Sequence, residues 1–262
     1  MTPVGPVTKP HPPLTGYYED ETRRQQFVRR LFDETAADYD RIERILAFGT
    51  GPWYRQQALR RAGVGPGAAV LDVGCGTGLL AMAALGLIGP HGHLVGVDPS
   101  PGMLARSQLG NVQLLEGIAE ALPVADASFD FVTMGYALRH IGDVRAAFQE
   151  FHRVLKPGGS VLILEIAKPS GALASALLKG YMRGFVPLLA RVVGRQQGTP
   201  ELWRYFWDTI EACVPPQRVL DTLLSAGFRQ VRRERQAGLF AEFLAVKPGG
   251  SHLAGDETAR AS

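Results

Sequence analysis

The stretch VLDVGCGTG at residues 70–78, followed by VGVD at residues 95–98, decides the fold of this chain. A short apolar run leads into an acid and a glycine-rich turn that contains Asp72, Gly74, Gly76 and Gly78. The helix-like run LLAMAALGLI follows, so the segment predicts a strand, a sharp turn and a buried helix. Glycines adopt positive φ at little cost and let the backbone approach a ligand closely. Asp98 ends a second apolar strand, where a carboxylate can accept hydrogen bonds from both hydroxyls of a ribose. The two motifs together predict a nucleoside-binding pocket.

The spacing of the glycines argues against a dinucleotide. A G-x-G-x-x-G fingerprint that starts at Gly74 needs a third glycine where this chain has Leu79. The observed G-x-G-x-G, preceded by an acid, suits a ligand that has no pyrophosphate to place at the helix N-terminus. S-adenosylmethionine is such a ligand, with Asp72 near its amino group and Asp98 at its ribose, so two carboxylates would face a cationic nucleoside. The alternative interpretation is that Asp72 caps the turn and Asp98 caps the next helix.

The composition indicates one globular domain. The chain has 262 residues, of which 46% are hydrophobic and 20% charged. We expect a single domain at residues 20–247 between disordered tails at residues 1–19 and 248–262. A net charge of +3 is too small to indicate a nucleic-acid partner. Because Cys75 and Cys213 form no disulfide framework and the N-terminus has no apolar leader segment, we expect a cytoplasmic protein.

Short apolar runs alternate with helical stretches between residues 66 and 166, which is typical of a mostly parallel sheet. In this interpretation residues 20–64 form N-terminal helices, residues 169–214 a helical insertion, and residues 216–247 a closing helix and hairpin. Asp143 is predicted to cap a helix that runs to residue 155 and stops at the sequence LKPGG.

Ligands of such sheets bind at the carboxyl ends of the strands. The candidate chemistry therefore lies near residues 72–78, 98–103, 116–120 and 134–140. His91 and His93 form an H-x-H pair, but they precede the second strand and so belong to the opposite end of the sheet. We therefore expect no metal site.

The motifs resemble those of the class I S-adenosylmethionine methyltransferases, and in particular the ubiquinone/menaquinone-biosynthesis C-methyltransferase group. The resemblance covers about residues 27–247, and besides the two opening motifs it rests on FDETAADYD at 32–40, FGTGPWYRQ at 48–56, EGIAEALPVADASFDFVTMGYALRHIGD at 116–143, FHRVLKPGG at 151–159 and WRYFWDTIEACVPP at 203–216. It implies an α/β fold: a Rossmann-like, doubly wound, mostly parallel seven-stranded sheet with a terminal antiparallel hairpin and a helical lid. It also implies S-adenosyl-L-methionine as the cofactor.

The same resemblance implies roles for individual residues. The expected cofactor-binding residues are Tyr39, Asp72, Gly74, Cys75, Gly76, Gly78, Asp98, Pro99, Met103, Gly117, Ile118, Ala119 and Gly135. The expected substrate-binding residues are Tyr136, Trp203, Tyr205 and Phe206. Met103 would cover one face of the adenine, although a methionine at such a position also serves as core.

Two positions depart from the pattern of the family. Where its members usually read G-D-A-E, this chain has Ile118, so the acceptor for the adenine amino group is missing. We expect weaker or differently organised cofactor binding, with backbone groups at residues 118 and 119 contacting the adenine. At Arg139-His140 the related enzymes commonly have Arg-Asn beside the methyl acceptor. We hypothesise that Arg139 holds the acceptor oxygen as an anion while His140 accepts a proton, against the alternative that His140 is a structural residue.

Residues 169–214 are predicted to form a lid that determines the substrate, because they interrupt the sheet pattern and are rich in large apolar residues, with a break at Pro187. Basic side chains recur in the lid at multiples of four, at Lys179, Arg183, Arg191 and Arg195. Such a surface suits peripheral contact with anionic lipid at the inner face of a membrane and entry of a prenyl tail. A lid over a soluble aromatic substrate fits the same pattern.

The resulting hypothesis is a methyltransferase that C-methylates a hydroxylated, prenylated quinol-type ring. Its nearest alternative is a natural-product methyltransferase that modifies a soluble phenolic or polyketide oxygen or carbon. An NAD-dependent oxidoreductase is disfavoured by Leu79, and a binding module without chemistry by Arg139 and the aromatic lid. The sequence leaves the oligomeric state open, a homodimer included.

Overall fold

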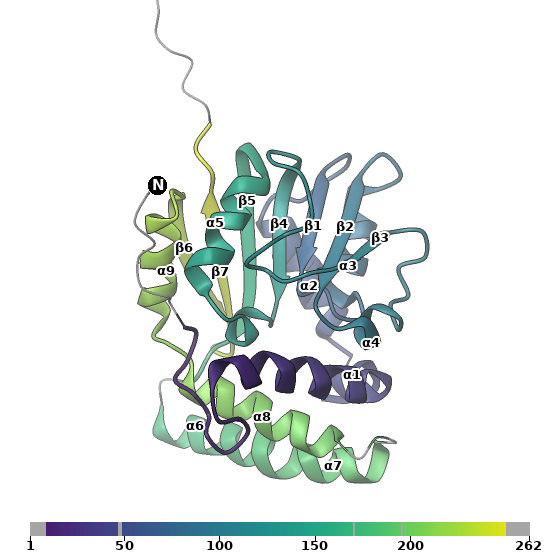
Figure 1. Ribbon diagram of the computed structural model, residues 1–262, viewed down its shortest axis with the longest axis vertical. Coiled ribbons are helices and arrows are strands. Elements are labelled where there is room, and N and C mark those ends of the chain that lie inside the picture. The colour runs from purple at the N-terminus through teal and green to yellow at the C-terminus, as the bar shows by residue number, and fades with distance from the viewer. Residues whose placement is uncertain (1–8, 47–48, 170, 195, 197, 250–262) are drawn as a thin grey trace, which may run out of the picture.

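A seven-stranded sheet in the order β3-β2-β1-β4-β5-β7-β6 forms the centre of the protein (Figure 1). The computed structural model describes residues 9–46, 49–169, 171–194, 196 and 198–249. The strands are β1 (Ala69–Val73), β2 (His93–Asp98), β3 (Gln113–Glu116), β4 (Phe129–Gly135), β5 (Leu155–Ile166), β6 (Arg229–Gln236) and β7 (Phe240–Val246). The first five pair in parallel, whereas β7 is antiparallel to both β5 and β6. The expected mostly parallel sheet with a terminal hairpin is thereby confirmed.

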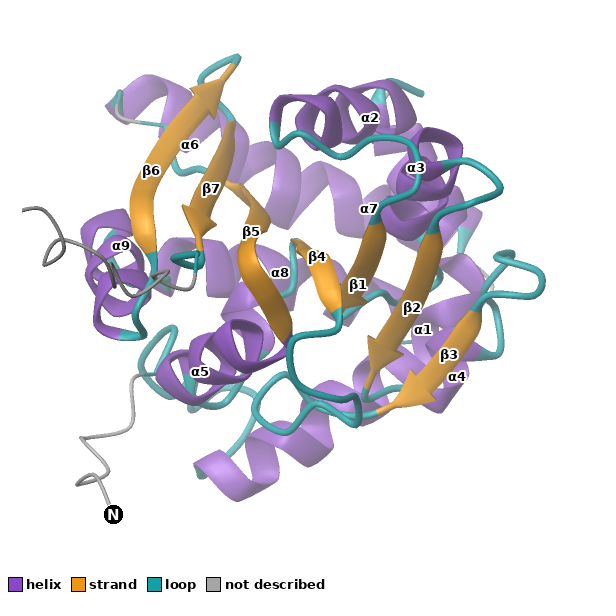
Figure 2. Ribbon diagram, turned by 90° about the horizontal axis from the view of Figure 1, so that it is seen from above, coloured by secondary structure: helices purple, strands orange, loops and turns teal. Residues whose placement is uncertain are grey.

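Helices cover both faces of the sheet, which explains why its central strands are apolar along their length (Figure 2). On one face, α2 (Gly51–Arg61) and α3 (Leu79–Ile88) enclose a core cluster with β1 and β5. On the other face, α5 (Val144–Val154) and α9 (Pro216–Ser225) pack against alternate residues of the same strands. The short helix α4 (Pro101–Leu104) follows β2.

Helix α5 begins as the sequence predicts. The Asp143 side chain accepts hydrogen bonds from the backbone N–H groups of Arg145 and Ala146, at 2.9 and 3.3 Å. The helix ends at Val154, and β5 begins at the next residue. The KPGG sequence therefore does not form a loop. It lies in the first part of β5, where the pairing with β4 shifts register between Phe129 and Phe131.

A second layer lies across the carboxyl ends of the parallel strands. It consists of α1 (Glu21–Leu46) and, beyond it, α6 (Ala172–Lys179), the π-helical segment η2 (Gly180–Phe185), α7 (Val186–Val193) and α8 (Thr199–Ala212) (Figure 1). This layer has its own aromatic core cluster, to which α1, α7 and α8 contribute. The expected helical lid is therefore present, and α1 separates it from the sheet.

The helical chain of the lid continues through Pro187 instead of breaking there. The π-helical segment ends at Phe185, and Pro187 lies in the first turn of α7. Proline lacks an N–H donor, and its ring clashes with the carbonyl of the residue four positions earlier. A wider turn immediately before it relieves both problems, which accounts for the π-helical geometry.

The predicted N-terminal tail, residues 1–19, is too long. Pro10 accepts a backbone hydrogen bond from Val214 at 2.8 Å, and the Tyr17 hydroxyl donates to Asp208 at 2.7 Å. Tyr18 is buried against α1. The proline-rich composition suggested disorder, but the two tyrosines bury apolar area on α1 and α8 and thereby anchor the segment. Residues 1–8, and residues 250–262 of the predicted C-terminal tail, lie outside the described residues.

Candidate functional site

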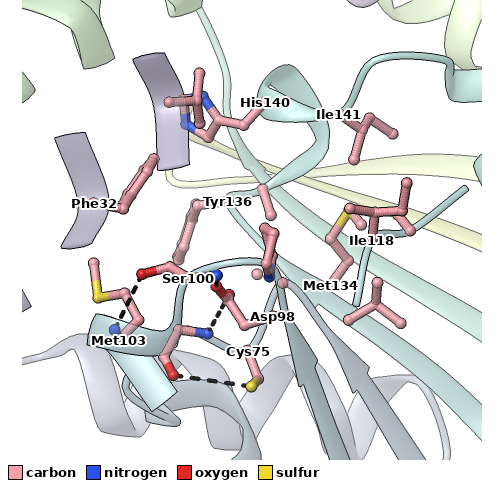
Figure 3. A pocket seen from close by; sticks show the side chains of 18 of the residues that line it. Phe32, Cys75, Asp98, Ser100, Met103, Ile118, Met134, Tyr136, His140 and Ile141 are labelled. Atoms are coloured by element: carbon pink, nitrogen blue, oxygen red, sulfur yellow. Dashed lines mark hydrogen bonds between the residues drawn. The ribbon is translucent and has the colours of Figure 1, made fainter. Parts of the chain in front are cut away.

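A cavity of about 350 Å³ lies at the carboxyl ends of β1, β2 and β4. Its floor is the glycine turn after β1, and its walls come from the segments after β2, β3 and β4. Helix α1 closes it with Phe32 and Tyr39, and α8 contributes Phe206. Figure 3 shows Asp98, Ser100 and Met103 on one side of this cavity, with Phe32, Tyr136 and His140 on another.

The turn after β1 has the geometry that its glycines predict. Gly74 and Gly76 have φ values of +67° and +57°. The backbone N–H groups of Gly74 and Cys75 donate to Val97 of β2, at 2.8 and 3.1 Å. A Cβ on Gly74 would lie 2.6 Å from the side chain of Ala137, so position 74 has no room for a side chain.

Gly78, which we expected to contact the cofactor, differs from the other two glycines. It is the N-cap of α3 with φ +93°, and it is not among the residues that line the cavity. A Cβ there would lie 2.7 Å from Leu109. Gly78 is therefore required for backbone conformation and close packing.

Asp98 faces the cavity and is held by the backbone. Its carboxylate accepts hydrogen bonds from the N–H groups of Gly76 and Ser100, both at 2.8 Å. Burial raises the pKa of Asp98 to about 6, and the two backbone donors oppose that rise. The carboxylate thus organises the glycine turn and the start of α4 in addition to lining the cavity.

Asp72 is more deeply buried and less well satisfied. One oxygen accepts a hydrogen bond from the Thr133 hydroxyl at 2.7 Å. The other, Oδ2, is buried and makes no hydrogen bond within the described residues. Burial raises the pKa of Asp72 to about 7, which the hydroxyl of Thr133 and the nearby backbone N–H of Ala81 only partly offset. A free carboxylate oxygen at the wall of a cavity is suited to bind a cationic group.

The side of the cavity near β3 is apolar. Met103 is almost fully buried and Ile118 remains 43% exposed, and both line the cavity. The acid of this segment, Glu120, is used elsewhere, because it accepts hydrogen bonds from the backbone N–H groups of Gly142 and Asp143 at 2.5 and 3.0 Å. Residue 118 is an isoleucine and supplies no hydrogen-bond acceptor for the adenine, and Glu120 does not replace it because its carboxylate already binds these two N–H groups. The remaining expected cofactor residues that line the cavity are Cys75, Pro99, Gly117, Ala119 and Gly135.

His140 lines the cavity from the short helix η1 (Leu138–His140). Its ring lies 5.3 to 5.5 Å from the ring centroids of Phe32, Tyr205 and Phe206. Neither ring nitrogen has a hydrogen-bond partner in the described part of the chain. Burial, together with the nearby charges of Arg139 and Arg24, holds the pKa of His140 well below its usual value. The imidazole is therefore neutral near pH 7, and one of its ring nitrogens has a free lone pair.

Arg139, which we expected beside the methyl acceptor, is not among the residues that line the cavity. Its guanidinium forms a buried ion pair with Glu165, donates to the Thr209 hydroxyl at 3.2 Å and lies 4.7 Å from the ring centroid of Phe206. In this structure Arg139 ties η1 to β5 and α8. A buried guanidinium needs a carboxylate partner, and Glu165 provides one away from the cavity.

Two of the four expected substrate residues reach the cavity. Tyr136 lines it with an unusual φ of +61°, and Phe206 lines it from α8. Trp203 instead stacks on Tyr39, with ring centroids 6.2 Å apart, and Tyr205 packs against α1. Trp203 and Tyr205 therefore support the wall from behind.

Several residues of the cavity wall are not evident from the sequence. Phe32, Ser100 and Ile141 line it, and so does Arg55 of α2, a buried cation. The signal for Arg55 was its place within the FGTGPWYRQ motif, in the helical segment that precedes the first strand. Nothing in the linear pattern shows that α2 turns this side chain toward Asp72.

Comparison with known proteins agrees with this geometry. The chain matches the ubiE/COQ5 methyltransferase family over residues 19–247. It is 32% identical over 237 residues to a ubiquinone/menaquinone biosynthesis C-methyltransferase of Pseudomonas fluorescens, covering 87% of this chain and 91% of that protein. It is 36% identical over 179 residues to a demethylmenaquinone methyltransferase of Geobacillus kaustophilus, covering 66% of this chain and 76% of that protein.

Solved structures share the fold at low sequence identity. A SAM-dependent methyltransferase of Thermotoga maritima superposes with a TM-score of 0.58 at 21% identity, covering 84% of this chain and 99% of that one. A phosphoethanolamine N-methyltransferase of Haemonchus contortus, in complex with S-adenosyl-L-methionine, gives 0.54 at 19% identity and covers 74% and 52%. The chain is thus an S-adenosylmethionine-dependent methyltransferase and belongs to the ubiE/COQ5 methyltransferase family.

Proposed function

We propose that the protein transfers a methyl group to a ring carbon of a hydroxylated, prenylated quinol. The single observation that carries this proposal is the neutral His140, which has no hydrogen-bond partner among the described residues and lies within an aromatic wall of the cofactor cavity. An aromatic wall suits a flat ring, and an unpaired imidazole suits a ring hydroxyl. The names of the two curated relatives, which refer to menaquinone and ubiquinone synthesis, support this substrate class.

The residues present fit the cofactor. The free Oδ2 of Asp72 is suited to its ammonium group and Asp98 to its ribose, while the glycine turn leaves space at the cavity floor. The apolar surfaces of Met103 and Ile118 are suited to the adenine. When bound, the cofactor supplies an electrophilic methyl group on a sulfonium.

His140 prepares the acceptor in this mechanism. Its neutral imidazole takes the proton of a ring hydroxyl, and the electron pair left on oxygen raises the electron density at the adjacent ring carbon. Phe32, Tyr136 and Phe206 hold the ring and keep water from the site. Arg139 acts as a positioning residue, because it fixes Phe206 and the helix that carries His140.

The acceptor is tested with the purified protein, a donor with a deuterated methyl group, and two acceptors: a short-chain demethylmenaquinol and a soluble phenol of similar ring size. We expect the label on a ring carbon of the quinol, and at least tenfold slower turnover by His140→Leu than by the wild type, because leucine can neither accept nor donate a proton. His152→Leu on α5, which does not line the cavity, is the control. Label on a phenol oxygen, or an unaffected His140→Leu, would contradict the proposal.

We further propose that the lid contacts an anionic membrane surface, through a face that the sequence pattern did not reveal. Two of its basic residues form ion pairs with α8, Lys179 with Glu211 and Arg183 with Asp208, at 3.0 and 3.2 Å, while both basic side chains stay about half exposed. Large apolar side chains turn outward, with exposures from 54% to 79%: Leu173, Leu177, Phe185, Leu188 and Val192. Arg195 of the predicted basic series lies outside the described residues. No helix among the described residues is long and apolar enough to cross a membrane.

An exposed apolar face beside arginines suits insertion at the lipid headgroup level, where a prenylated quinol would also be found. We expect the protein to sediment with vesicles that contain phosphatidylglycerol, and the double variant Leu188→Glu, Val192→Glu to remain in the supernatant. The double variant Gln113→Glu, Gln149→Glu, at exposed positions of β3 and α5, adds the same two charges elsewhere and should still sediment. Equal binding by all three proteins would overturn the proposal, as would dimerisation through this face.

A further inference from the structure

Arg55 is a buried cation at the wall of the cofactor cavity. Its residue is only 4% exposed, yet it lines the cavity together with Asp72 and Tyr136. The guanidinium lies 5.9 Å from the ring centroid of Tyr136, and one of its nitrogens donates to Glu43 of α1 at 2.5 Å. Its charge is close enough to Asp72 to oppose the rise in the pKa of that carboxyl.

The amino-acid end of S-adenosylmethionine carries an ammonium and a carboxylate on the same carbon. If Asp72 takes the ammonium, the carboxylate must lie nearby, and burying it without a cation or donor would be costly. The described residues that line the cavity include a second arginine, Arg29, but its side chain is 48% exposed and pairs with Glu116 at the end of β3. Arg55 is therefore the arginine at the Asp72 end.

We propose that Arg55 binds the carboxylate of the amino-acid end of S-adenosylmethionine, and that Glu43 positions its guanidinium for this contact. A guanidinium has five N–H donors, and the hydrogen bond to Glu43 occupies one nitrogen, which leaves others for a carboxylate. The pair Asp72 and Arg55 then matches the ammonium and carboxylate of the ligand with charges of opposite sign. This inference concerns the cofactor and is independent of the methyl acceptor.

The experiment compares two ligands that differ in one group. S-adenosylmethionine and decarboxylated S-adenosylmethionine share the sulfonium, the adenosine and the amine, and only the first has the carboxylate. Calorimetry should show that the wild type prefers S-adenosylmethionine by roughly 10- to 100-fold, the range expected for a hydrogen-bonded charge pair. In Arg55→Met the two affinities should agree within about threefold, because only the carboxylate loses its partner.

Two variants separate this role from a purely structural one. Glu43→Gln removes the charge of the partner on α1 but keeps a hydrogen-bond acceptor for Arg55 and keeps the cation, so it should retain at least a tenfold preference for S-adenosylmethionine. Arg60→Met, an exposed arginine on the same helix that does not line the cavity, should behave as the wild type. Retained binding of the decarboxylated ligand shows that Arg55→Met is folded, whatever its Tm.

The proposal is overturned if the wild type binds both ligands equally well, or if Arg55→Met loses both by the same factor and Glu43→Gln does likewise. Those results would assign Arg55 to the packing of α1 on α2. They would leave the proposed acceptor untouched, because neither measurement involves methyl transfer.

Discussion

The two acids of the cavity differ in how their charges are satisfied. Asp98 accepts hydrogen bonds from two backbone N–H groups, whereas Asp72 has one hydroxyl donor and an unpaired oxygen. Both are buried, so the pKa of each lies above the ordinary 3.8, at about 6 for Asp98 and about 7 for Asp72. The less satisfied carboxylate has the higher pKa, as desolvation requires.

This difference predicts a pH dependence of cofactor binding. Below pH 7 the Asp72 carboxyl of the free protein is mostly protonated, and a proton must leave before a cationic ammonium can bind well. Affinity should therefore rise by about tenfold per pH unit from pH 6 to 7 and level off above, with a steeper dependence below pH 6 where Asp98 also protonates. Calorimetry between pH 5.5 and 7.5 measures this. If the affinity of Asp72→Asn changes with pH as steeply as that of the wild type, the pH dependence belongs to another group.

Because residue 118 is an isoleucine, we expect the adenine amino group to have no side-chain hydrogen-bond acceptor there. An aspartate there should tighten cofactor binding by about 2- to 10-fold, the worth of one added hydrogen bond. Ile118→Leu keeps an apolar side chain and should leave the affinity unchanged. The gain should vanish with a cofactor analogue that carries hypoxanthine in place of adenine, since hypoxanthine has no amino group. A gain that persists with this analogue would argue against an adenine at Ile118.

At the scale of elements, the turn between β1 and α3 combines two kinds of glycine. Gly76 has φ +57° and lines the cavity, and no atom lies within 4 Å of where its Cβ would be. Gly78 has φ +93° and would place a Cβ against Leu109. The same residue type thus serves the ligand at one position and packing at the other.

The two glycines should respond differently to alanine. Gly78→Ala should lower the free energy of unfolding by about 2 kcal/mol or more, from a left-handed backbone and an overpacked Leu109, and leave cofactor affinity within about twofold. Gly76→Ala should lower stability by about 1 kcal/mol but weaken cofactor binding more, because its N–H also holds Asp98. Urea unfolding and calorimetry on the same samples test both. A larger affinity loss in Gly78→Ala would reverse the assignment.

At the scale of the whole molecule, the sheet and the helical layer are joined by Arg139 and Glu165. Glu165 lies near the end of β5, Arg139 in η1, and Thr209, which accepts from Arg139, in α8. Both charged side chains are buried, so each depends on the other.

Removing one partner should therefore be more harmful than removing both. Arg139→Met leaves a buried carboxylate without its cation and should lower the free energy of unfolding by about 3 kcal/mol or more. The double variant Arg139→Met, Glu165→Leu should recover at least half of that loss in urea unfolding. If the double variant does not recover stability, the contact of Arg139 with Phe206, and not the ion pair, joins the two layers.

The sequence by itself determined the elements whose interactions are local. Positive φ at Gly74 and Gly76 and the cap at Asp143 involve groups within a few residues of one another, so a linear pattern contains them. The parallel direction of the first five strands followed from the alternation of apolar runs and helices. The aromatic and basic residues of the lid were visible as well, but the direction in which each one points was not.

Only the tertiary structure decided which side chains face the cavity. Arg139 and His140 are neighbours on a short helix with three residues per turn, so they point about 120° apart and a single rotation decides which of them meets a ligand. That rotation depends on Glu165 and α8, which follow 26 or more residues later in the chain. Arg55 reaches the cavity for the same reason, because the packing of α2 against α3 and the ion pair with Glu43 of α1 set its direction. Long-range packing, which a local pattern does not contain, therefore selected the residues of the site.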